Sequence, residues 1–108
     1  MSLLQQIESQ EIDKNQLCIY FLGQSGYVLN FNELTIYIDP YLSDYIENPL
    51  GLNEKNMYRL FPPPINPELI SKCDAIICTH SHVDHMDPWT ISKINSDFKF
   101  FSSIGAYE

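Results

Sequence analysis

All three histidines of this 108-residue chain lie in one short stretch, THSHVDH at positions 79–85, with an aspartate among them. Neutral imidazole and carboxylate together suit zinc, manganese or iron, whereas calcium prefers ligands that are all oxygen. In extended backbone, His80 and His82 project to the same side because successive side chains alternate. We therefore expect this pair to bind one divalent ion, and Asp84 and His85 to face a second ion beside it.

A histidine loop that is merely structural or solvated is the alternative to a metal site. The flanking sequence favours the metal site. The apolar run DAIICT at 74–79 predicts a strand buried on both faces. Asp87 can cap a helix that begins at Pro88 and runs to about Asn95. The histidines then follow the carboxyl end of a strand, where open α/β sheets bind ligands.

The remaining elements predict an α/β (α+β) fold in which residues 1–108 belong to one domain. Apolar runs at 16–22, 27–31 and 34–38 are separated by short turns and predict an antiparallel meander. Short helices are expected over 3–12 and over 67–72, the second capped by Asn66, and another strand begins at Lys99. Residues 45–66 are rich in proline and sustain no period, which predicts an irregular loop.

The charge balance limits the classes of partner. Six basic and fourteen acidic residues give a formal net charge of -8, which disfavours nucleic acid and anionic membrane surfaces. There is no membrane-length apolar run, and the first residues do not resemble a signal peptide. We expect a cytoplasmic protein whose cysteines, Cys18, Cys73 and Cys78, are reduced core residues.

The pattern His80-x-His82-x-Asp84-His85 after an apolar strand resembles the signature of the metallo-β-lactamase superfamily. IYIDP at 36–40 and GQSG at 23–26 resemble the strand-end aspartate and the glycine turn of these proteins. FLGQSGYVLNF, IDPYLSD and CDAIICTHSHVDHMD, over about residues 17–105, are similar to the L-ascorbate-6-phosphate lactonase branch. The resemblance implies a four-layer αββα sandwich, with its N-terminal half present in this chain.

The resemblance also implies a metal-dependent hydrolase in which a metal-bound hydroxide attacks a lactone or ester carbonyl. His80 and His82 would bind the first of two ions, zinc or manganese or else iron, and Asp84 and His85 the second. Asp84 would also orient the attacking water and is the candidate catalytic residue. Asp39 would accept a hydrogen bond from a ligand histidine, and its alternative role is a turn residue at a strand end.

The family pattern places Arg59 where it would contact the phosphate of a phosphorylated sugar lactone; a solvated loop arginine is the alternative.

The family's remaining ligands lie further along the sequence, and this chain has no histidine after His85. We therefore expect the chain alone to be incomplete as an enzyme. Phosphodiester hydrolysis and a non-catalytic fragment that binds metal or a partner chain stay open as alternatives. That partner would be another copy of the chain or a complementing C-terminal chain, because unpaired strand edges tend to pair.

Overall fold

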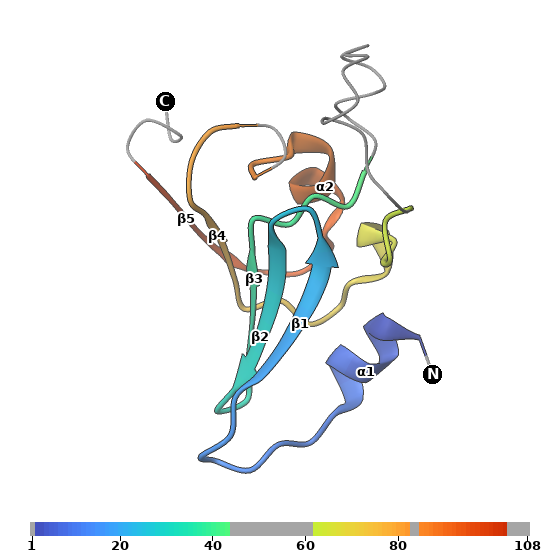
Figure 1. Ribbon diagram of the computed structural model, residues 1–108, viewed down its shortest axis with the longest axis vertical. Helices are drawn as coiled ribbons and strands as arrows, with labels where there is room; N and C mark the ends of the chain where they lie inside the picture. Colours follow the sequence, from blue (N-terminus) through green and yellow to red (C-terminus); the bar gives the residue numbers. More distant parts are fainter. Residues whose placement is uncertain (1, 44–61, 83–84, 104–108) are drawn as a thin grey trace.

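The structure is a computed structural model that describes residues 2–43, 62–82 and 85–103 (Figure 1). Its five strands form one sheet in chain order: β1 (Cys18–Gly23), β2 (Gly26–Phe31), β3 (Leu34–Ile38), β4 (Ala75–Cys78) and β5 (Lys99–Ser102). The first three strands pair antiparallel, and β3, β4 and β5 pair parallel. The predicted α+β class and the antiparallel meander are confirmed.

Backbone with positive φ forms both turns of the meander. Asn32 and Glu33 have φ values of 47° and 65°, which fits the two-residue hairpin turns that follow the twist of a sheet. In the turn between β1 and β2, Gly23 has φ 91° and Gln24 has φ 51°. A Cβ on Gly26 would lie 2.9 Å from the backbone oxygen of Asp39, so glycine lets this turn pack against the end of β3.

The helices cover one face of the sheet. Val28, Tyr37 and Ile76 are adjacent across β2, β3 and β4, and all three are fully buried. They belong to a core cluster that includes Ile7 from α1 (Leu3–Ser9) and Ile94, which follows α2 (Pro88–Lys93). Burial of these apolar side chains is the main force that holds the helices to the sheet.

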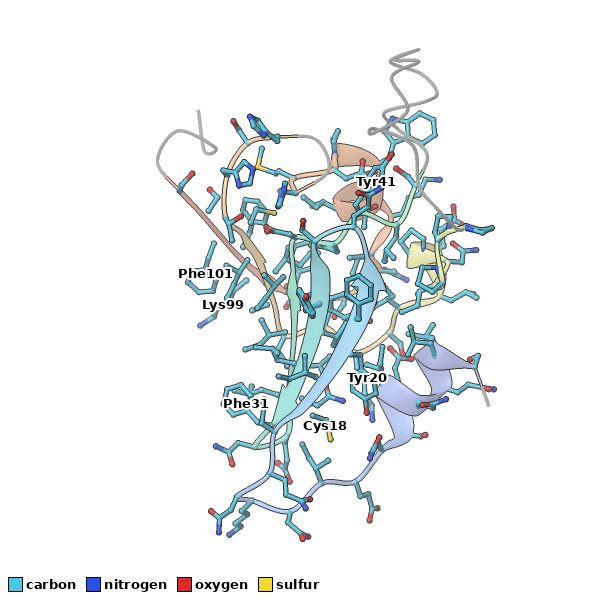
Figure 2. All side chains as sticks on the ribbon, viewed as in Figure 1. Cys18, Tyr20, Phe31, Tyr41, Lys99 and Phe101 are labelled. Atoms are coloured by element: carbon cyan, nitrogen blue, oxygen red, sulfur yellow. The ribbon has the colours of Figure 1, made fainter. Side chains whose placement is uncertain are left out.

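The other face of the sheet is apolar and largely exposed. One row of apolar side chains crosses all five strands on this face: Phe21, Tyr27, Ile38, Ile77 and Phe101. The side chains at its two ends, Phe21 and Phe101, are more than half exposed. Figure 2 shows Phe101 on the side of the sheet away from α1. On this face of β4, Ala75 and Ile77 are only half-buried, so the predicted burial of β4 on both faces is wrong. The part of the chain that the structure describes forms one sheet layer and one helical layer of the expected sandwich.

The helices are shorter than the sequence suggests. α1 ends at Ser9, and the predicted helix over 67–72 is a three-residue 3-10 helix, η2 (Pro67–Leu69), capped by Asn66 as expected. The backbone at Ile70 and Ile94 is already extended, which ends η2 and α2.

Residues 62–66 of the predicted loop contain no helix or strand, and 45–61 lie outside the described residues. Among the described helices, none has the length and apolar character that crossing a membrane requires.

Asp87 fixes the helix that follows the histidine stretch. It is the N-cap of α2 and fully buried, and it accepts the backbone N–H of Trp89 at 3.0 Å. The Oδ2 atom of Asp87 also accepts the hydroxyls of Ser43 and Thr90 at 2.5 and 2.6 Å. The Thr90 hydroxyl oxygen in turn accepts the N–H of Leu42 at 2.8 Å. One carboxylate thus joins α2 to the segment that follows β3.

We predict that Asp87→Ala destabilises the protein by about 2–3 kcal/mol, because it removes a helix cap and the acceptor of the buried Thr90 hydroxyl. Urea unfolding followed by circular dichroism measures this change. Asp97→Ala, at an exposed carboxylate, is the matched control and should change the free energy of unfolding by less than about 0.5 kcal/mol. Equal urea midpoints for the two variants would contradict the role of Asp87.

Candidate metal centre

The site is built on Asp39, the residue that follows β3. Asp39 is only 3% exposed and has a φ of 46°, a left-handed conformation that aspartate tolerates better than most residues. Its N–H donates to the carbonyl of Ile77 at 2.9 Å, which continues the β3–β4 pairing past the end of β3. The strained backbone turns the Asp39 carboxylate toward the residue that follows β4.

That residue is Thr79, which donates twice to the carboxylate of Asp39. The Thr79 N–H lies 2.7 Å from Oδ1, and the Thr79 hydroxyl lies 2.7 Å from Oδ2. The carboxyl ends of the parallel strands β3 and β4 are therefore joined by a two-point contact. This contact determines where the chain leaves β4 and enters the histidine stretch.

A third donor reaches the same carboxylate from His85. Its Nδ1 atom lies 2.7 Å from Oδ2 of Asp39, and the His85 side chain is 16% exposed. The N–H groups of His85 and Met86 donate to the carbonyl of His82 at 2.9 and 2.8 Å. These two hydrogen bonds hold His85 and Met86 close to His82, beside the end of the sheet. Because the carboxylate only accepts hydrogen bonds, Nδ1 of His85 carries a proton, and in the neutral ring Nε2 then carries the lone pair.

The three imidazole rings lie close together. The ring centroids of His80 and His82 are 4.6 Å apart in an edge-to-face arrangement, and those of His80 and His85 are 3.9 Å apart. Nδ1 of His80 lies 3.0 Å from the hydroxyl oxygen of Thr79. The structure therefore gathers the three histidines and Asp39 at one point, at the carboxyl ends of β3 and β4. That they bind metal stays a prediction.

The donor chemistry fits a divalent transition ion, but the described part of the chain does not form a complete site. Within residues 2–43, 62–82 and 85–103, no group of three or more histidine, cysteine, aspartate or glutamate side chains is arranged to hold a metal. Asp84, the predicted fourth ligand and catalytic residue, lies outside the described residues, as does Arg59. Imidazole nitrogens are ligands that zinc, manganese and iron accept.

Cys78 shares the strand alternation of His80 and His82 but lies beneath the site. It is 1% exposed, and burial, followed by the charge of Asp39, raises the pKa of its thiol to about 12. Burial and the neighbouring Asp74 likewise raise the pKa of Cys73 to about 12. Both remain neutral thiols near neutral pH, and the thiolate is the form that binds metal. These two cysteines are core residues as expected, whereas Cys18 is only partly buried.

Thr79 was not predicted as a site residue, because the sequence marks it only as the last residue of a strand. In the structure Thr79 contacts both Asp39 and His80. The only signal in the sequence was its hydroxyl, placed directly before the first histidine. Its partner Asp39 is 40 residues earlier in the chain, so the contact depends on the pairing register of β3 and β4.

Residues 18–108 match the family described as the Beta-lactamase superfamily domain, and the chain belongs to that family. An uncharacterized protein of Mycobacterium tuberculosis is 28% identical over 79 residues, which are 73% of this chain and 20% of that protein. A protein of Mycobacterium bovis matches to the same extent. The match thus spans about a fifth of the length of these relatives. Family membership indicates a hydrolase-type fold.

The transcription antitermination protein NusB of Helicobacter pylori is 33% identical over 73 residues, which are 62% of this chain and 53% of NusB. This match covers less than two thirds of either protein. It gives no basis for assigning this chain to the NusB family.

We predict that only Cys18 reacts readily with a thiol reagent in the native protein, because the raised pKa values of Cys73 and Cys78 keep both protonated. Titration with dithionitrobenzoate at about pH 8 should give one fast thiol per native chain and three in urea. Cys18→Ser should remove the fast thiol. Fast labelling that survives in Cys18→Ser would show that a core thiol is ionised or accessible.

Proposed function

We propose that this chain supplies the histidine-rich side of the active site of a metal-dependent hydrolase. The observation that carries the proposal is the cluster of three imidazoles anchored to a buried carboxylate. It lies at the carboxyl ends of β3 and β4, within a domain of the Beta-lactamase superfamily. A buried aspartate that receives three hydrogen bonds holds the loop where an ion would require fixed ligands.

His80, His82, Asp84 and His85 would hold the ions, with zinc or manganese the expected metals. When bound, a divalent ion activates water as a nucleophile and polarises the bond to be cleaved. Asp39 holds the Nδ1 proton of His85, so that ring offers its Nε2 lone pair. Asp84 would orient the attacking water and accept its proton, as in the family that the sequence resembles.

The proposed substrate is a small lactone or ester, in line with the resemblance to the L-ascorbate-6-phosphate lactonase branch. The net charge of -8 repels polyanions such as RNA, whereas a small molecule with one phosphate experiences much less repulsion. Arg59 would contact that phosphate through its planar guanidinium group. Remaining ligands would come from sequence beyond the matched segment or from a partner chain.

We predict that the chain alone binds Zn²⁺ or Mn²⁺ far more weakly than closed four-ligand sites do, because its ligand set is partial. Isothermal titration calorimetry should detect binding that His80→Ala or His82→Ala abolishes. Cys18→Ser is the matched control and excludes uptake by the partly exposed thiol. Binding that persists unchanged in both histidine variants would place the metal elsewhere and overturn the proposal.

We predict little turnover by the chain alone and measurable lactone hydrolysis by a full-length relative that contains the same histidine stretch. Assays with a phosphorylated sugar lactone and a model phosphodiester, each with added Zn²⁺ or Mn²⁺, separate the two hydrolase classes. Preferential phosphodiester turnover would replace the lactonase assignment with that of a phosphodiesterase. No turnover of either substrate by the metal-loaded full-length relative would favour a non-catalytic binding module.

A further inference from the structure

The geometry points to Thr79 as a positioning residue that fixes the tautomer of His80, through a hydrogen-bond relay to the carboxylate of Asp39. The hydrogen bonds of Thr79 stand independently of the proposed function, but their role in metal binding by His80 rests on it. The relay connects both His80 and His85 to one carboxylate. His85 reaches it directly, and His80 reaches it through the Thr79 hydroxyl.

The direction of each hydrogen bond follows from counting protons. The Thr79 hydroxyl oxygen lies 2.7 Å from Oδ2 of Asp39, and two oxygens approach this closely only with a proton between them. The carboxylate has no proton to give, so the hydroxyl of Thr79 donates. That hydroxyl has a single proton. Its oxygen therefore presents a lone pair to Nδ1 of His80, which lies 3.0 Å away.

The neutral ring of His80 must then carry its proton on Nδ1 and its lone pair on Nε2. The same tautomer follows for His85, whose Nδ1 donates directly to Asp39. The carboxylate of Asp39 thus fixes the same tautomer in both rings, so that both offer Nε2 as a ligand atom. In water, histidine favours the opposite tautomer, with its proton on Nε2. Without the relay, His80 would have to change tautomer before it could bind an ion through that atom.

The alternative is that Thr79 is purely structural and joins the ends of β3 and β4. Its backbone N–H already makes such a contact with Oδ1 of Asp39 at 2.7 Å, and that contact does not need the side chain. The hydroxyl is therefore additional to the link between the two strands. Thr79→Val keeps the β-branched shape and removes only the relay, whereas Thr79→Ser keeps the hydroxyl.

The test is ¹⁵N NMR of the metal-free chain at about pH 9, above the range in which histidine ordinarily titrates. Long-range ¹H–¹⁵N correlation spectra distinguish the two tautomers, and single His→Ala variants assign the three rings. We expect His80 and His85 of the native chain to be protonated on Nδ1. In Thr79→Val, His80 should shift toward the Nε2-protonated form while His85 and His82 stay unchanged. Thr79→Ser should restore the native spectrum.

A second measurement connects the tautomer to metal binding. Thr79→Val should weaken Zn²⁺ affinity about 10- to 100-fold in calorimetry, and Thr79→Ser should keep most of it. An unchanged His80 tautomer in Thr79→Val overturns the relay, whatever the metal result. If the tautomer shifts as expected but the native chain binds no Zn²⁺, the relay stands and the proposed function fails.

Discussion

The carboxylate of Asp39 is the constraint on which the rest of this site depends. A buried carboxylate is costly unless hydrogen bonds replace the water it has lost. Asp39 recovers that cost from three donors: the backbone and the hydroxyl of Thr79, and the ring of His85. Each donor therefore has a fixed position, and the histidine stretch is held at both ends. The positive φ of Asp39 directs the carboxylate toward these donors, and Gly26 leaves room for the backbone oxygen of Asp39 beside the β1–β2 turn.

The sheet topology explains why this contact is available. Ile38 pairs with Ile77 in parallel register, so Asp39 and Thr79 leave the sheet at the same edge. The connection between β3 and β4 is long, as a parallel crossover must be. Asp87 stabilises the other side of the stretch, because it caps α2 and binds the hydroxyl of Ser43 in the segment after β3. Two buried aspartates therefore bracket the histidines, each making contacts with residues distant in sequence.

Sequence patterns predicted the elements well and the contacts between them poorly. Strand residues and short turns identified the meander, and Asp87 and Asn66 were recognised as caps from local rules. The Thr79–Asp39 contact could not be predicted, because it depends on strand register across 40 residues. The apolar run in β4 was misjudged for a different reason. An apolar run shows that burial of the strand is favourable, but it does not show that other elements pack on both of its faces.

The choice of aspartate at position 39 follows from three requirements that few residues meet together. The position needs positive φ, which aspartate and asparagine tolerate better than other non-glycine residues. It needs a short side chain, because the backbone of Thr79 lies 2.7 Å from the first oxygen. It also needs two acceptor atoms, since Thr79 and His85 together present three donors. Asparagine would turn its amide N–H₂ toward one of these donors. The side chain would then no longer accept hydrogen bonds at both positions, and it could not fix the tautomers of His80 and His85 together. Only a carboxylate of this length meets all three requirements at once.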